Sequence, residues 1–127
     1  MRNPFKPKVP KNLEESAKAL KKIFEKHKLW DHLRDDENTF VAKTHNYGGR
    51  WIRNNWGLWT GDSELYKSLK EMGFTHADDM SSVILRNFYR TQKNMEPLDL
   101  DAEVKHYKDY WDKMENNQSV VLKSKSV

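Results

Sequence analysis

The chain has 127 residues, which suits one domain and is too short for two ordinary ones. It contains no cysteine, so disulfide bonds, thiolate zinc sites and cysteine nucleophiles are excluded. No stretch is long and apolar enough to span a membrane, and the first residues do not form a secretory signal, so we expect a cytoplasmic protein. Five Trp, five Tyr and five Phe predict a folded chain with an aromatic core.

The net charge of +4 conceals an uneven distribution along the chain. Residues 1–28 hold nine Lys and Arg against three Asp and Glu, whereas residues 29–115 hold twelve against sixteen. A nucleic-acid-binding domain usually carries a basic stripe on its folded body. The basic charge here lies at the N-terminal end, which favours a solvated charged arm and leaves nucleic-acid binding through that arm as an alternative.

The N-terminal segment is predicted to be an extended arm followed by a helix. Pro4, Pro7 and Pro10 oppose helix formation over residues 1–11. Asn12 and Glu15 have the spacing of a capping box, which predicts a helix over 13–27. Its apolar stripe comprises Leu13, Ala17, Leu20, Ile23 and Phe24. A short helical turn near 29–33 should end in an acidic loop at 35–37.

The stretch 38–59 has apolar residues at helical spacing but contains Gly48 and Gly49. Each glycine costs about 1 kcal/mol in a helix relative to alanine. Two explanations stay open. The glycines allow another helix to approach closely, or they break the stretch before a helix at 50–56. We favour helical structure throughout.

Three further helices are predicted from stripes and capping patterns. The first follows a cap at Asp62 and ends at Gly73, a natural C-terminal glycine. The second begins with a capping box at Thr75 and Asp78 and runs to about Gln92. The third starts at a cap on Asp99 or Asp101 and carries apolar residues to Met114.

These elements predict an all-α fold with one compact domain of about five helices. The domain should span 12–115, with a flexible arm at 1–11 and a disordered tail at 116–127. One core should bury the inward positions of every stripe. The residues expected to be largely buried are Leu20, Phe24, Ile52, Trp56, Leu69, Ile84, Phe88, Val104, Tyr107 and Trp111.

The segment 45–62 concentrates unusual residues, with four of the chain's five glycines and three tryptophans. The pattern His45, Gly49, Ile52-Arg53-Asn54 and Gly57-Leu58-Trp59, followed by 76–82 (HADDMSS), resembles a small family of uncharacterised bacterial and phage-associated domains. The resemblance covers about 45–90. It implies a shared fold and a shared site but no activity.

The two arginines of this segment have two interpretations. Arg53, at the edge of the apolar face, extends over the core and pairs with Asp78 or Asp79. Alternatively, Arg50 and Arg53 hold a phosphate or carboxylate beside glycine N–H groups. Neither standard phosphate-binding motif is present, so the first interpretation is favoured.

The remaining polar residues offer weaker signals for chemistry. Asp78 and Asp79 are adjacent in a first helical turn and point about 100° apart, so they do not form a facing carboxylate pair. His45 lies on the predicted apolar face and reads as a hydrogen-bonded core histidine. Its position with His76 does not match a zinc motif, so we expect neither a metal nor a cofactor. Trp51 projects away from the core and is the better candidate for an exposed contact than Trp56.

The sequence therefore favours a small binding or regulatory protein, and we expect its partner to be another protein. The expected contact surface comprises His45, Arg50, Trp51, Arg53, Asn54, His76, Asp78 and Asp79. The resemblance implies a modulator of a host or defence protein. The alternatives are an enzyme that acts on a phosphorylated or nucleotide-like small molecule, with His45 or His76 as general base, and nucleic-acid binding through the arm. No membrane partner is expected.

Overall fold

Helix α5 (Ala77–Gln92) lies at the centre of the fold and contacts α1 (Leu13–Lys26), α2 (Glu37–Thr44) and α3 (Arg50–Asn55). The computed structural model describes residues 8–125, with side chains up to Asn117. Within that range the chain is helical and contains no strand, which confirms the all-α prediction. A 3-10 turn, η1 (Trp30–Arg34), links α1 to α2.

The stretch around Gly48 and Gly49 does not break. Helix α2 continues through a single π-helical turn, η2 (His45–Gly49), directly into α3. Gly49 is buried, and a Cβ atom there would lie 2.9 Å from Arg53 Nη1 and 3.6 Å from Ser81 Oγ of α5. The first explanation is therefore the correct one, because the glycine lets α5 approach closely. With α2–η2–α3 counted as one run, the described chain has about five helical segments, as predicted.

The core is built around an aromatic cluster on α5. Phe88 packs against Phe24 of α1, with ring centroids 4.7 Å apart, and Phe40 of α2 packs against both rings. Seven of the ten predicted core residues are buried, among them Ile52, Trp56 and Leu69. The prediction was wrong for the other three, which lie on α6 and are only half-buried: Val104, Tyr107 and Trp111.

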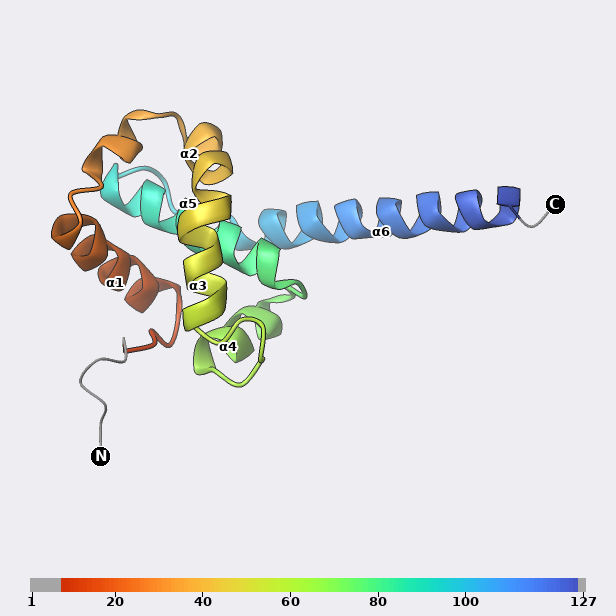
Figure 1. The fold of residues 1–127 in the computed structure, drawn as a ribbon, viewed down its shortest axis with the longest axis horizontal. Coiled ribbons are helices and arrows are strands. Elements are labelled where there is room, and N and C mark those ends of the chain that lie inside the picture. Colours follow the sequence, from red (N-terminus) through yellow and green to blue (C-terminus); the bar gives the residue numbers. More distant parts are fainter. Residues whose placement is uncertain (1–7, 126–127) are drawn as a thin grey trace.

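These three are half-buried because the described contacts of α6 (Leu100–Lys125) with the body come from its N-terminal half, along one side of the helix. Val104 packs on Gly73, the C-terminal glycine of α4 (Glu64–Met72), and Tyr107 lies edge-on against Phe74. The rest of α6 projects away from the body (Figure 1). The helix continues to Lys125, past residue 115 where the sequence analysis placed the end of the domain. The division into arm, domain and tail stays a prediction, since residues 1–7 and the side chains beyond Asn117 lie outside the described part.

The helix starts agree with some of the predicted caps and correct others. Asn12 accepts a hydrogen bond from Glu15 N, and Asp99 accepts one from Ala102 N, as predicted. The cap of α4 is Ser63 rather than Asp62. The capping box at Thr75 was wrong, because α5 begins one residue later than that box requires, and His76 occupies the N-cap position without a side-chain cap.

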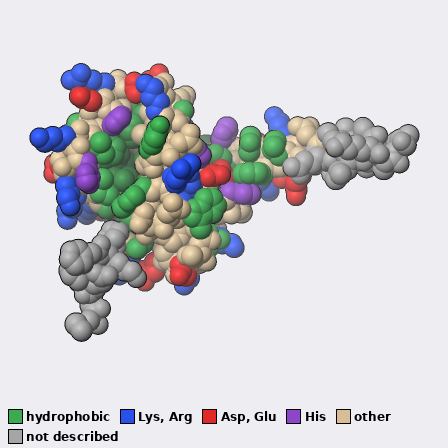
Figure 2. Space-filling model, viewed as in Figure 1, with side chains coloured by type: hydrophobic (Ala, Val, Ile, Leu, Met, Phe, Trp, Pro, Cys, Tyr) green, Lys and Arg blue, Asp and Glu red, His purple; other side chains and the backbone are tan. Residues whose placement is uncertain are grey.

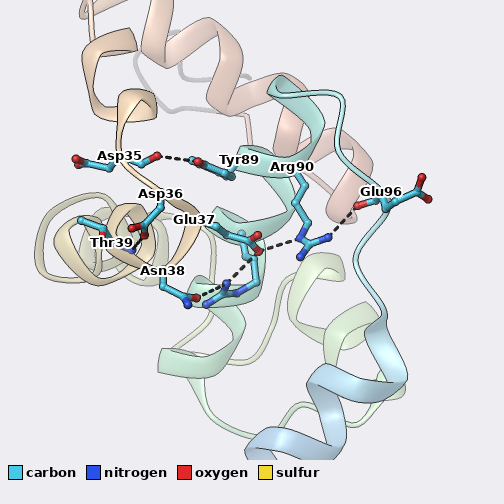
Figure 3. A network of polar contacts seen from close by, with 9 residues as sticks. Asp35, Asp36, Glu37, Asn38, Thr39, Tyr89, Arg90 and Glu96 are labelled. Carbon is cyan, nitrogen blue, oxygen red and sulfur yellow. Dashed lines mark hydrogen bonds and ion pairs between the residues drawn. The ribbon is translucent and has the colours of Figure 1, made fainter.

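A polar network fixes the start of α2 to α5 (Figure 3). The Glu37 carboxylate accepts hydrogen bonds from Arg90 Nε at 2.8 Å and from Arg86 Nη1 at 3.0 Å. Burial alone would raise the pKa of Glu37, but the two arginines outweigh it and the pKa is lowered. Glu37 was predicted to lie in an acidic loop at 35–37, but it is the first residue of α2.

Candidate functional site

Helix α3 divides the predicted site residues between two edges of its buried stripe. Ile52 and Trp56 point into the core, and successive residues on a helix are about 100° apart. Arg53 and Trp51 therefore lie at opposite edges of that stripe. Arg53 faces the start of α5, whereas Trp51 lines a hollow beside α1.

Arg53 is the most buried charged residue of the site, at 6% exposure. Its Nη1 donates to Ser81 Oγ at 2.8 Å, and its Nη2 donates to the His45 carbonyl oxygen at 3.2 Å. Its Nε lies 3.3 Å from Asp78 Oδ1, which confirms the predicted contact. That pairing is through one nitrogen, and the Nε–H lacks hydrogen-bond geometry towards any described acceptor. Three described residues thus share one guanidinium.

The carboxylate of Asp78 lies between Arg53 and His45. The distance from His45 Nε2 to Asp78 Oδ1 is 3.9 Å, and both side chains reach the surface. His45 belongs to the π-helical turn and its side chain is about one-third exposed. The prediction of a core histidine was therefore wrong. The extra residue of a π turn shifts the face on which following side chains emerge.

The neighbouring Asp79 belongs to a separate cluster with His76 and α6. Its Oδ2 accepts a hydrogen bond of 2.7 Å from Trp111 Nε1 and lies 3.9 Å from His76 Nδ1. The His76 ring stacks on Trp111, with centroids 3.6 Å apart and an interplanar angle of 10°. Burial raises the pKa of Asp79 despite the Trp111 N–H, which acts in the opposite direction. This cluster attaches α6 to the body.

The outer face of the α2–α3 run exposes large aromatic side chains. Tyr47, in the π turn, is 81% exposed, and Trp59, just after α3, is 60% exposed. The Trp59 indole N–H donates to Asn54 Oδ1 at 3.0 Å, and the Arg53 guanidinium carbon lies 5.9 Å from the Trp59 ring centroid. Trp59 is consequently held in place although most of its surface faces solvent. Arg50 is exposed on the same face and forms no ion pair with a described residue.

Seven of the eight predicted site residues fall into three places, and the eighth, Arg50, is exposed and forms no ion pair with a described residue. His45, Arg53 and Asp78 meet, and Asn54 joins them through Trp59; His76 and Asp79 meet on Trp111; Trp51 lies apart beside α1. Two residues of the site were not predicted: Ser81, the partner of Arg53, and the exposed Tyr47. The sequence did contain a signal for this contact. Gly49 lies four residues before Arg53, on the same face of the helix, and its small size leaves room for Arg53 to reach a polar residue of the neighbouring helix.

The two glycines and Arg53 are not arranged as the predicted anion site. Gly48 and Gly49 lie inside a continuous helical run, so their N–H groups do not form the open helix start that binds anions. Arg53 already has acceptors on two sides. Among the described residues no three His, Asp or Glu side chains gather into a metal-binding cluster. No helix of the described chain is long and apolar enough to cross a bilayer.

The sequence matches a family described as a domain of unknown function, DUF6794, over residues 9–92. The match covers well over half of the chain, so the protein belongs to this family. It begins before α1 and ends with α5, so the family domain includes the first helix, which the motif resemblance had left out, and stops before α6. No curated protein and no solved structure matches the chain.

Proposed function

We propose that this member of the DUF6794 family is a protein-binding module whose contact surface is the outer face of η2 and α3, together with the start of α5. The surface comprises Tyr47, Arg50, Asn54 and Trp59, with His45 and Asp78 at its edge. Aromatic and arginine side chains carry most of the binding energy in protein interfaces. Modulation of a host or defence protein is the role that the motif resemblance implies for such a surface, and it stays an expectation.

The observation that carries the proposal is the fixed but exposed Trp59. A surface tryptophan without partners loses side-chain entropy when it binds, which reduces affinity. Trp59 has already lost that freedom, because Asn54 accepts its N–H and Arg53 lies near its ring. It can therefore insert into a partner's pocket at a lower entropic cost. Tyr47, in the π turn that leads into α3, supplies a second exposed aromatic side chain.

The alternatives receive less support from the geometry. An enzyme acting on a phosphorylated molecule would need Arg50, Arg53 and a histidine to converge on one hollow. One hollow lies between α1 and α3, and another lies between α1 and the C-terminal end of α5. Of the predicted site residues, only Trp51 lines either of them. Nucleic-acid binding through the arm has no geometric support, because most of the arm lies outside the described residues.

Site-specific photo-crosslinking in the source cells tests the proposal. A photoreactive phenylalanine derivative replaces Tyr47 in one variant and the exposed Tyr110 of α6 in a control variant. We expect a discrete crosslinked protein at position 47 that is absent at position 110. The purified pair should then lose about tenfold or more in affinity with Trp59→Ala, the effect of removing an anchor residue.

Two results would count against the proposal. One is a crosslinking pattern at position 47 that equals the pattern at position 110. The other is a purified complex whose affinity is unchanged by Trp59→Ala while the variant melts at the parent temperature.

A further inference from the structure

A groove of about 440 Å³ lies between α1 and α3, at the opposite edge of α3 from Arg53. Its apolar lining includes Ala19 and Ile23 of α1 and Trp51 and Trp56 of α3 and its C-terminus. Hydrophobic side chains reach the surface in this part of the molecule, and Lys and Arg side chains lie along its outer margin (Figure 2). The groove is independent of the surface around Trp59.

The two tryptophans give the groove a preformed aromatic wall. Trp51 is 37% exposed and packs edge-on against Trp56, with ring centroids 5.6 Å apart and an interplanar angle of 74°. Trp56 is buried, and its indole N–H has no hydrogen-bond partner among the described residues. An exposed ring supported from behind is suited to cover an inserted apolar side chain. The Trp56 ring also lines the groove, and its unpaired N–H is a group that an oxygen acceptor would stabilise.

The rim of the groove is positively charged. Lys8, Lys18 and Lys22 line it, against one acidic lining residue, Glu15. Lys18 also forms an exposed ion pair of 3.5 Å with Glu14, and the rim keeps a net positive charge. The remainder of the folded body is acidic on balance, with sixteen Asp and Glu against twelve Lys and Arg over residues 29–115. The groove is therefore a local basic site on a mildly acidic domain, and it favours a ligand of negative charge.

We infer that this groove binds an acidic segment of a partner protein that inserts one apolar side chain against Trp51. The charge of the rim selects Asp and Glu around the inserted residue, and the aliphatic surface of Ile23 and Ala19 receives its apolar part. Nucleic acid fits less well, because a strand needs successive stacking rings and the groove presents one exposed ring. The chain's own residues 1–7 contain Arg2 and Lys6, which carry the same positive charge as the rim. Charge repulsion therefore makes this segment a poorer ligand for the groove than an acidic one.

Selection from a random peptide library against the full-length chain tests the inference. We expect enriched peptides with several acidic residues around one Leu, Ile, Phe or Trp. Affinities measured from nuclear magnetic resonance titrations should fall about tenfold with Trp51→Ala. They should fall at least as far with Lys18→Glu combined with Lys22→Glu, and that double variant should gain affinity for the same peptides with Lys in place of every acid.

Matched controls separate this site from its competitors. Trp59→Ala should leave peptide binding unchanged, so failure here and failure of the proposed function are distinguishable. Lys67→Glu combined with Lys70→Glu changes the net charge equally on α4, away from the groove, and should have little effect. Variants are compared only if their circular dichroism spectra and melting curves match the parent.

Four outcomes would overturn the inference. The library yields no enriched peptides, or the enriched peptides ignore the charge reversal at positions 18 and 22. A single-stranded oligonucleotide binds more tightly than the peptides and is lost with Trp51→Ala, which would assign the groove to nucleic acid. Phe5→Ala raises peptide affinity by tenfold or more, which would assign the groove to the chain's own N-terminal segment.

Discussion

Arg53 Nη1 and Ser81 Oγ form a buried hydrogen bond of 2.8 Å that joins α3 to α5. The same guanidinium lies 3.3 Å from Asp78, but that carboxylate is 51% exposed. Water screens an exposed ion pair, whereas a buried donor that loses its acceptor is not compensated by solvent. The neutral hydroxyl is therefore the more important partner of the arginine, although the sequence pattern directs attention to the acid.

Arg53→Lys should lower the free energy of unfolding by about 2–4 kcal/mol, because lysine cannot donate to Ser81 and to the His45 carbonyl at the same time. Ser81→Ala should cost about 1–3 kcal/mol and Asp78→Asn less than about 1 kcal/mol. Urea denaturation of the single and double variants measures the coupling energies. A coupling between Arg53 and Asp78 larger than that between Arg53 and Ser81 would contradict this assignment.

Gly48 and Gly49 should respond in opposite ways to alanine. A Cβ at Gly48 meets its nearest atoms at 3.9 and 4.0 Å, so Gly48→Ala should stabilise the fold by up to about 1 kcal/mol through helix propensity. A Cβ at Gly49 comes within 2.9 Å of Arg53 Nη1, which Ser81 holds in place. Gly49→Ala should therefore be destabilising. Thermal melting of the two variants decides this, and equal shifts would show that the arginine moves aside freely.

The helical periodicity predicted the fold well where a stripe faces the central core. Leu20 on α1 and Ile84 on α5 are buried as their spacing requires. The same periodicity overestimated how deeply α6 is buried. Trp111 has the expected helical spacing, but its side chain is only half-buried. A stripe records which residues share a face, and it does not record how much of that face another element covers.

The site was predictable in its residues more than in its grouping. The absence of acids between Asn38 and Gly61 indicated that Arg53 would find its partner on another element, and Asp78 is there. The π turn could not be predicted from the pattern, and His45, its first residue, is partly exposed rather than buried in the core. The separation of Asp79 from Asp78 depends on the path of α6, which local sequence does not determine.

Asp79→Asn should preserve the Trp111 hydrogen bond, since the asparagine Oδ1 can accept it, and remove a buried charge. Because the pKa of Asp79 is raised by burial, the folded state favours its protonated form. The stability of the parent therefore falls as pH rises through that pKa. We expect the asparagine variant to be at least as stable as the parent at pH 7.5, with the difference disappearing in acid.

Trp111→Ala serves as the comparison for Asp79→Asn in urea titrations at both pH values. It removes the indole donor and the ring that stacks on His76. Because the side chain is half-buried, we expect a loss of about 1–3 kcal/mol, below the range for a fully buried tryptophan. An asparagine variant as unstable at pH 7.5 as the alanine variant would show that the charge of Asp79 stabilises α6 on the body.

Glu37→Gln should destabilise the fold near neutral pH and flatten its response to acid. The pKa of Glu37 is lowered in the folded state, because Arg90 and Arg86 outweigh the effect of burial. A carboxylate with a lowered pKa contributes stability above its unfolded pKa and loses it as pH falls through the folded value. Glutamine retains an acceptor oxygen but not the charge, so we expect a loss of about 1–3 kcal/mol at pH 7 that shrinks as pH falls.

Asp35→Asn, at an exposed pairing with Lys43, should cost less than about 1 kcal/mol and is the matched control. Urea titrations from pH 7 to pH 3 measure both variants, and parallel curves for Glu37→Gln and the parent would exclude Glu37 as a source of acid sensitivity.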